Sequence, residues 1–234
     1  MSAKISIVIP VLNEASKIAK TIASAQSGKN IEILVVDGGS QDNTVELVQS
    51  LGLKVLFAAT GRANQMNVGA KAATGEILLF LHADTLLPSG FDRTVRRVLC
   101  QPNTIAGAFA LQIDGSLRGL RLVEKGVNLR SHFLSLPYGD QAIFVKAETF
   151  KVLGGYTQLP IMEDFEFVLR LRKNGKIAIV PTPVITSSRR WQKLGVWQTT
   201  IVNQLAIAAY LLKVPPKRIA KWYRCKFSSS TQNY

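Results

Sequence analysis

The residues best suited to chemistry lie at the end of a short apolar segment. Residues 76–85 read Glu-Ile-Leu-Leu-Phe-Leu-His-Ala-Asp-Thr, so His82 and Asp84 directly follow a run typical of a buried strand. Ligands of open α/β sheets bind beyond the carboxyl ends of the strands, where an acid can contact a metal ion and a phosphate. Taken alone, Asp84 could equally cap a turn or a helix.

Polar residues also follow the first two predicted strands. The first strand ends in Pro-Val-Leu-Asn-Glu (10–14) and the second in Asp-Gly-Gly-Ser-Gln-Asp (37–42). Glu14 and Asp42 could serve only as helix caps, or as acids near the positive end of a helix dipole. Asp37 is harder to explain in this way, because the paired glycines after it indicate close approach of the backbone to a bound group.

Two predicted helix starts carry charged residues. Arg62 opens a helix whose Ala/Gly-rich continuation can pack closely on a sheet. Arg62 and Lys71 could be ordinary surface charges, but a cation near the N–H groups of a helix start is also what a diphosphate requires. Glu163, Asp164 and Glu166 are explained, by position alone, as the acidic first turn of a helix over 163–173.

These residues need a scaffold of alternating strands and helices. The β-α-β-α order predicts an α/β fold with a mostly parallel sheet and helices on both faces. From about 105 to 191 the alternation is less regular, and irregular segments on a rigid scaffold commonly carry specificity. Strands are predicted near 5–12, 31–36, 53–58, 76–82, 106–111 and 142–145, and helices near 14–26, 42–51, 63–73 and 90–100.

Composition and charge set the class of protein. The 234 residues are 47% hydrophobic and 19% charged, which predicts a folded chain with a sizeable core. Two cysteines provide neither a disulfide framework nor zinc-ligand spacing, and the N-terminus lacks the pattern of a signal peptide. Most of the net charge of +14 comes from residues 167–234, which contain 13 Lys/Arg and no acid, whereas residues 1–166 contain 16 Lys/Arg and 15 acids.

The basic C-terminal region contains two candidate amphipathic segments. Residues 194–212 are uncharged and just long enough to span a bilayer, but their Gln, Thr and Asn residues favour a helix that lies on the folded domain or in a membrane interface. In the segment 217–227, Ile219, Trp222 and Tyr223 share one face with cations around it. This face predicts either an anchor on anionic lipid or a helix that closes the core.

Several short motifs follow one another along the chain. They are Ile-Pro-Val-Leu-Asn-Glu (9–14), Val-Asp-Gly-Gly-Ser-Gln-Asp-Asn-Thr (36–44), Asn67 with Gly69, His-Ala-Asp-Thr (82–85), Tyr-Gly-Asp-Gln-Ala-Ile-Phe (138–144), Gly-Gly-Tyr (154–156), Met-Glu-Asp-Phe (162–165) and Ser-Arg-Arg-Trp (188–191). In this order they resemble the family 2 inverting glycosyltransferases, which have the Rossmann-like GT-A fold. The resemblance covers about residues 4–225 and is closest to a small bacterial subfamily of stand-alone transferases.

The resemblance implies a role for each matching residue. Asp164 corresponds to the catalytic base, with Glu163 beside it, and Asp84 to the acid that contacts a divalent cation and the donor phosphates. Asp37 corresponds to the acid that recognises uracil in relatives that use uridine nucleotides. The expected nucleotide-binding residues are Pro10, Asn13, Glu14, Asp37, Gly39, Arg62, Asn67, His82, Ala83 and Asp84, and the expected donor-sugar and acceptor residues are Gly139, Asp140, Gln141, Arg190 and Trp191.

The sequence departs from the family's pattern in two places. His82 replaces the first acid of the Asp-x-Asp signature. A neutral imidazole can ligate Mn²⁺ but suits Mg²⁺ poorly, so Asp84 is expected to be the sole protein carboxylate on the metal, with His82 near the ribose or a phosphate. Ser187 replaces the leading Gln of the signature that ends in Arg190-Trp191 in processive members, so a polymerising enzyme is not predicted.

The resemblance therefore implies an enzyme that moves a sugar from a nucleotide-diphosphate donor, expected to be a UDP-sugar, to a hydroxyl acceptor. A lipid-linked or apolar acceptor is one candidate. The expected organisation is a catalytic domain over 1–191, with a nucleotide-sugar half over 1–100 and an acceptor half over 101–191. A basic helical tail over 192–227 and a disordered end over 228–234 would follow.

Two other functions would explain part of the sequence. A nucleotidyltransferase acting on a sugar phosphate has a related fold and a metal-binding Asp, but it begins with a Gly-rich basic loop where this chain has Pro-Val-Leu-Asn-Glu. A nucleic-acid-binding protein would explain the net charge, but the charge is confined to the tail and no aromatic-basic motif is present. The expected setting is cytoplasmic, with peripheral contact to the inner face of the cell membrane, Mn²⁺ or Mg²⁺ as cofactor, and no nucleic-acid partner.

Overall fold

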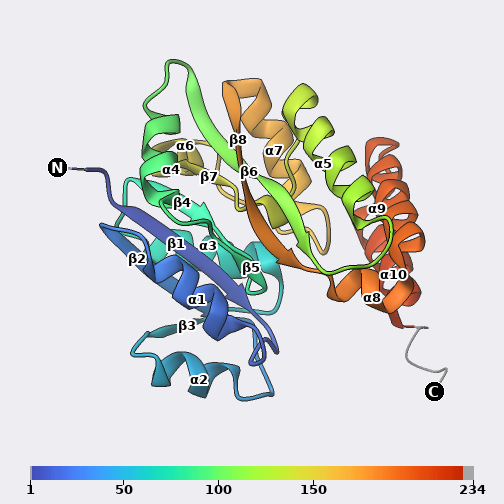
Figure 1. The fold of residues 1–234 in the computed structure, drawn as a ribbon, viewed down its shortest axis with the longest axis horizontal. Coiled ribbons are helices and arrows are strands. Elements are labelled where there is room, and N and C mark those ends of the chain that lie inside the picture. The colour runs from blue at the N-terminus through green and yellow to red at the C-terminus, as the bar shows by residue number, and fades with distance from the viewer. Residues whose placement is uncertain (1, 229–234) are drawn as a thin grey trace.

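The first hundred residues alternate between strands and helices, as Figure 1 shows for the computed structural model, which describes residues 2–228. This part of the chain corresponds to the predicted β-α-β-α order. Its elements are β1 (Ile5–Val11), α1 (Ile18–Gln26), β2 (Ile31–Asp37), α2 (Thr44–Ser50), β3 (Val55–Phe57), α3 (Arg62–Ala72), β4 (Ile77–Phe80), β5 (Thr85–Leu86) and α4 (Phe91–Leu99).

The second part of the chain contains two long strands and most of the helices. A short 3₁₀ helix, η1, lies between α5 and β7. The elements are β6 (Thr104–Asp114), α5 (Leu120–Leu134), η1 (Gly139–Gln141), β7 (Phe144–Lys146), α6 (Ala147–Val152), α7 (Glu163–Asn174), β8 (Lys176–Ser187), α8 (Arg189–Leu194), α9 (Val196–Leu211) and α10 (Pro216–Ser228).

The strands form one eight-stranded sheet with the order β3-β2-β1-β4-β7-β6-β8-β5. Strands β3, β2, β1 and β4 run parallel, and β6 and β8 run parallel to each other. Strand β7 is antiparallel to both β4 and β6, and the short β5 is antiparallel to β8. The expected α/β fold with a mostly parallel sheet is confirmed. The carboxyl ends of β1, β2 and β4 therefore meet at one edge.

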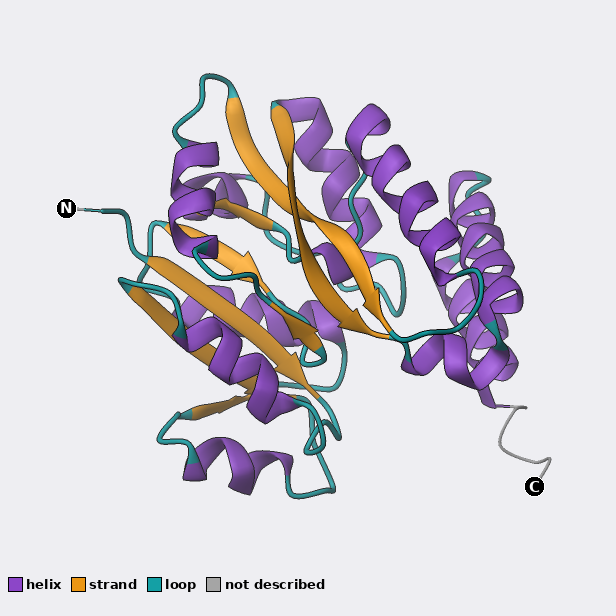
Figure 2. Ribbon diagram, in the orientation of Figure 1, coloured by secondary structure: helices purple, strands orange, loops and turns teal. Residues whose placement is uncertain are grey.

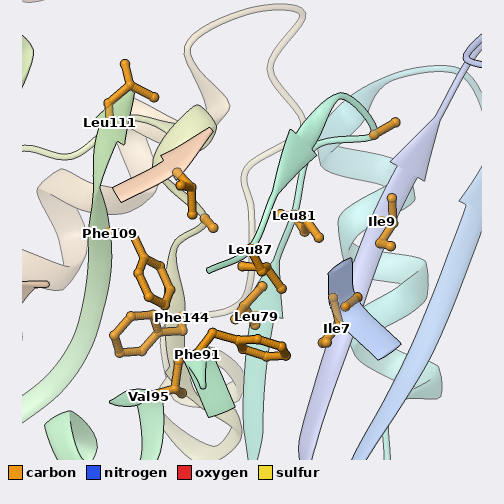
Figure 3. Close-up of a cluster of buried hydrophobic side chains, with 14 of the residues drawn as sticks. Ile7, Ile9, Leu79, Leu81, Leu87, Phe91, Val95, Phe109, Leu111 and Phe144 are labelled. Carbon is orange, nitrogen blue, oxygen red and sulfur yellow. The ribbon is translucent and has the colours of Figure 1, made fainter. Parts of the chain in front are cut away.

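Helices cover both faces of the sheet (Figure 2), and a separate apolar cluster fills each face. Strand β1 contributes to both, because Ile7 and Ile9 point to one face and Val8 to the other. Figure 3 shows Phe91 and Val95 of α4 packed against Leu79, Phe109 and Phe144 on one face. Strands buried on both faces have continuous apolar sequences, which explains why β1 and β4 were recognisable.

Close packing of α3 on the sheet depends on a glycine. A Cβ at Gly69 would lie 2.3 Å from Cγ1 of Val8 and 3.0 Å from Cγ2 of Val36. Only a residue without a side chain allows the helix axis to come this near. The Gly/Ala-rich sequence of α3 thus fixes the distance between Arg62, at its first turn, and the end of β1.

Two helices begin later than the sequence predicts. The expected helix over 14–26 starts at Ile18, because residues 14–17 form a turn in which Lys17 and Ile18 donate to the Glu14 carbonyl. The expected helix over 42–51 starts at Thr44, whose N–H donates to Asp42 Oδ1 at 3.1 Å. In both cases a side chain or a carbonyl satisfies N–H groups ahead of the first turn.

The tail forms helices, and its apolar face is turned inward. Ile219 of α10 is 2% exposed and clusters with Met162 and Phe165 at the start of α7, with Trp222 and Tyr223 partly buried beside them. The face that the sequence offered as a lipid anchor therefore packs on the catalytic domain. No helix in the described part of the chain is long and apolar enough to cross a membrane. The expected disordered end falls, apart from the last residue of α10, on residues 229–234, which lie outside the described residues.

Candidate functional site

The loops that follow β1 and β2 are tied to each other by side chains of predicted site residues. The Asp37 carboxylate is buried and accepts the N–H groups of Gly39 at 2.7 Å and Ser40 at 3.0 Å. The Asn13 side chain accepts the Gln41 N–H at 2.8 Å, and the Asn13 backbone N–H donates to Ser40 Oγ at 2.9 Å. Asn13 and Gly39 both have positive φ, at 56° and 99°. The two loops thus form one preorganised surface beyond the sheet edge.

An arginine from α8 reaches the same edge from far along the chain. The Arg189 Nη2 atom lies 2.6 Å from Glu14 Oε1 and 3.4 Å from Asp84 Oδ2. Within residues 2–228, Glu14 Oε2 is buried without a hydrogen-bond partner. The guanidinium thereby joins the loop after β1 to the loop after β4, and it neutralises two acids that would otherwise repel each other. Arg189 was not among the predicted site residues.

The side chains of Arg62, His82 and Glu163 form a row. Arg62 Nη1 lies 3.3 Å from His82 Nε2, and Arg62 Nε lies 2.9 Å from Glu163 Oε1. Burial, followed by the nearby charges of Arg62 and Arg190, lowers the pKa of His82 well below its ordinary value. His82 is therefore a neutral imidazole at neutral pH. Burial raises the pKa of Glu163, although the Arg62 guanidinium opposes this shift.

Asp164 and His82 approach η1 at the same residue, Gly139. The Asp164 Oδ2 atom accepts the Gly139 N–H at 2.8 Å. A Cβ at Gly139 would lie 2.9 Å from both Asp164 Oδ2 and His82 Nε2. The predicted base and the predicted nucleotide contact therefore come close to this backbone only because Gly139 has no side chain. Two residues 82 positions apart in sequence are brought to the same side of Gly139.

A further carboxylate is held without a full set of partners. Among the described residues, Asp140 Oδ1 is buried with no hydrogen bond. Burial raises the pKa of Asp140, with Asp164 and Asp84 adding to the shift and Arg130 and Arg190 opposing it. Arg130 stacks on the Tyr138 ring, with its Cζ 3.4 Å from the ring centroid. A buried carboxylate that lacks a partner is suited to bind a hydroxyl group or a cation.

Some predicted site residues are used inside the protein. The Asn67 side chain donates to the Tyr156 carbonyl at 2.8 Å and accepts the Tyr156 N–H at 2.9 Å. Gln141 is fully buried, accepts the Ser131 hydroxyl at 2.9 Å and donates to the Phe109 carbonyl at 2.9 Å. Both side chains position the segments on which the site is built. Pro10 and Ala83 are also buried, at the ends of β1 and after β4.

The Arg-Trp pair lies on α8. Trp191 is 7% exposed, and its Nε1 atom is buried without a partner in the described part of the structure. Arg190 is exposed, and its charge acts on His82 and Asp140. Arg190 therefore borders the site, whereas Trp191 packs in the core cluster with Val184 and Val196, so its role toward the acceptor stays a prediction.

The side chains at the site offer few ligands for a divalent cation. Among residues 2–228, no group of three His, Cys, Asp or Glu side chains is arranged to hold a metal ion. The Asp84 side chain is 21% exposed, and only its Oδ2 atom lies near Arg189, at 3.4 Å. Asp84 can therefore offer one carboxylate to a metal ion. Such a site fits a cation that takes most of its oxygen ligands from a bound diphosphate and water.

Comparison with known proteins decides the family. Residues 6–155 match the family described as glycosyl transferase family 2. The chain belongs to this family. It is 27% identical over 210 residues to an uncharacterized glycosyltransferase from Haemophilus influenzae, covering 82% of this chain and 81% of that protein. It is also 27% identical over 210 residues to the PGL/p-HBAD biosynthesis glycosyltransferase of Mycobacterium tuberculosis, covering 85% and 80%. The chain is a glycosyltransferase.

Solved structures share the fold of this family 2 enzyme. A mannosyltransferase from Pyrobaculum calidifontis, PcManGT, solved with GDP-Man and Mn²⁺, superposes with a TM-score of 0.68 at 18% identity, covering 98% of this chain and 74% of that one. S. aureus TarS 1-349 in complex with UDP-GlcNAc superposes with a TM-score of 0.63 at 18% identity, covering 79% and 58%. The GT-A fold implied by the motifs is confirmed.

The structure adds Arg189, Arg130 and Tyr138 to the residues of the site. Sequence reasoning passed over Arg189 because Arg190, its neighbour, corresponds to the family signature. Two adjacent arginines just after a strand indicate that both side chains can reach the edge of the sheet. Arg130 lies within an amphipathic helix, where a single cation is indistinguishable from surface charge.

Proposed function

We propose that this glycosyltransferase acts by a single displacement with inversion, and that Asp164 is the general base. The observation that carries the proposal is that Asp164 Oδ2 and His82 Nε2 lie together on the same side of Gly139, next to the Arg62–Glu163 ion pair. A base must lie near one end of the reacting bond and cationic or hydrogen-bonding groups near the other. This set supplies both kinds of group at one place beside η1.

In the proposed step, an acceptor hydroxyl oxygen forms a bond to the anomeric carbon while the bond from that carbon to the diphosphate oxygen breaks. The electron pair leaves with the diphosphate, and the hydroxyl proton passes to the Asp164 carboxylate. Glu163 forms an ion pair with Arg62 and orients the guanidinium, and Arg62 and His82, which lie together, would contact the departing phosphates. No covalent intermediate with the protein is needed.

The donor is proposed to be a UDP-sugar. Support comes from Asp37, which corresponds to the uracil-recognising acid and lies in the preorganised loop surface with Asn13 and Gly39. A divalent cation, Mn²⁺ or Mg²⁺, is proposed to bind Asp84 together with the diphosphate, where it would stabilise charge on the leaving group. GDP-Man bound by PcManGT makes a guanosine donor the alternative that the donor panel must include.

The acceptor is proposed to be a hydroxyl compound with an apolar or lipid-linked part. It would bind on the side of the site formed by Asp140, Arg190 and Trp191, within the proposed acceptor half. Asp140 Oδ1 and Trp191 Nε1 have no hydrogen-bond partner among the described residues, and in this proposal they would accept and donate hydrogen bonds to the acceptor. A cytoplasmic enzyme in peripheral contact with the inner face of the cell membrane is proposed as its setting.

Release of nucleotide from a panel of UDP-, GDP- and other nucleotide sugars, with and without Mn²⁺ or Mg²⁺, tests this function. The wild-type chain should release UDP in a metal-dependent way, and Asp84→Asn should lose most of that release. Glu148→Gln, which changes an exposed carboxylate on α6, is the matched control and should release UDP at the wild-type rate. Metal-independent release that survives Asp84→Asn would contradict the proposed metal contact.

A further inference from the structure

Helix α9, about 24 Å long, exposes an apolar stripe. Trp197, Ile201 and Leu205 are 59%, 57% and 51% exposed, and Leu212, the residue directly after the helix, is 79% exposed. Their spacing of four, four and seven residues continues one helical face. The opposite face of α9, with Val202 and Ala206, is buried. The stripe contains no charged residue, which is unusual for a surface open to water.

A second exposed apolar stripe lies on α5, which begins beside α9. Leu122, Leu129 and Phe133 are 60%, 61% and 73% exposed and recur at helical spacing. A Cβ at Gly119, the residue before α5, would lie 3.4 Å from Cζ2 of Trp197. The two helices therefore start at one point, and Figure 1 shows both at the end of the molecule away from β2 and β3. We call these seven residues the α5/α9 surface.

The charges around the α5/α9 surface have one predominant sign. Arg118 and Lys125 are exposed on and before α5, and Lys193 and Lys213 are exposed at the two ends of α9. Residues 167–234 contain no acid at all. An apolar stripe bordered by cations is complementary to an anionic bilayer, in which apolar side chains enter the interface and cations remain near the headgroups. A protein partner would need a matching apolar face ringed with acids.

We propose that the α5/α9 surface docks the enzyme on an anionic lipid bilayer. The surface differs from the α10 face that the sequence suggested, since that face is buried against α7. Helix α9 follows directly on Arg190 and Trp191, so docking places the acceptor side of the site close to the headgroup level. The consequence for an apolar acceptor rests on the proposed function, whereas the docking itself does not.

Co-sedimentation of the full chain with vesicles tests the proposal. Vesicles of phosphatidylcholine with about 30% phosphatidylglycerol should bind the chain at about 50 mM NaCl and release part of it at about 500 mM, because salt screens exposed charges. Ile201→Ser/Leu205→Ser should lower the partition coefficient by about tenfold or more, since exposed aliphatic groups then no longer leave water on binding. Both changes are at exposed positions, so the fold should be kept, as circular dichroism and thermal unfolding will show.

A matched control separates this surface from general hydrophobicity. Leu51→Ser/Val152→Ser removes two exposed aliphatic side chains: Leu51, directly after α2 and 40% exposed, and Val152, at the end of α6 and 79% exposed. This variant should bind vesicles like the wild type. Equal loss in both variants, or no binding by the wild type, would overturn the proposal. A lipid-free dimer that Ile201→Ser/Leu205→Ser dissociates, with no vesicle binding, would assign the surface to a second copy instead. Vesicle binding without sugar transfer would contradict the proposed function only.

Discussion

Replacing Asp164 by Asn separates the chemistry of the base from its structural role. Asn has the same shape and retains an oxygen that can accept the Gly139 N–H, now at 2.8 Å from Asp164 Oδ2. What it loses is the negative charge, the ability to take a proton, and the second oxygen, since Asp164 Oδ1 accepts the Phe165 N–H at 2.8 Å. The expected result is therefore a large loss of turnover in a protein that still folds.

The magnitudes follow from the contacts. Loss of a general base lowers turnover by roughly 10²–10⁴-fold, which corresponds to about 3–5 kcal/mol of activation free energy. Exchanging a charged acceptor for a neutral one costs about 1 kcal/mol of folding free energy. Part of that cost is offset, because the Asp164 charge raises the pKa of both Asp140 and Glu163 and its removal relieves this repulsion. The melting temperature should fall by no more than about 2–4 °C.

Glu163→Gln is the informative companion. This change removes the carboxylate partner of Arg62 at a position where the Glu163 side chain is only 4% exposed. The free energy of unfolding should therefore fall by about 1–3 kcal/mol, after allowance for the exposed part of Arg62. Turnover should fall less than in Asp164→Asn. Single-turnover rates with the donor identified by the panel, together with urea unfolding, measure both quantities. A wild-type rate in Asp164→Asn combined with an inactive Glu163→Gln would show that Glu163 is the base.

Three further outcomes are expected. Burial alone would raise the pKa of Glu32, but hydrogen bonds led by that from Ser6 lower it from 4.5 to about 2, so its stabilisation is present above pH 4.5 and is lost as the pH falls toward 2. Glu32→Gln should thus lower the unfolding free energy by about 1–2 kcal/mol at pH 7 and much less at pH 2, in urea titrations at both pH values. Asn67→Ala should destabilise the fold by about 1–3 kcal/mol in the same assay, because two backbone groups lose their partner. Gly139→Ala, whose Cβ would lie 2.9 Å from Asp164 Oδ2, should slow transfer by about tenfold or more while the melting temperature changes little.

The fold and the position of the site could be predicted because burial leaves a local pattern. The continuous apolar runs of β1 and β4 and the amphipathic repeat of α4 each require only neighbours in sequence to be recognised. Acids at 37 and 84 then had to lie at the sheet edge, because parallel strands end there together. The family motifs added roles to these positions, and the glycosyltransferase class was confirmed.

What the sequence could not predict is which partner each side chain meets. Arg189 contacts Glu14 across 175 positions, and Asp164 and His82 meet beside Gly139. Strand β5, which directly follows Asp84, pairs with the end of β8 and so brings Arg189 to the loop after β4. Amphipathic patterns show that a helix has an apolar face without showing what covers it. Only packing decided that Ile219 of α10 is buried against α7 while the stripe on α9 is left exposed. Sequence by itself determined the elements and the chemistry available at their ends, and tertiary contacts determined which of those groups act on one another.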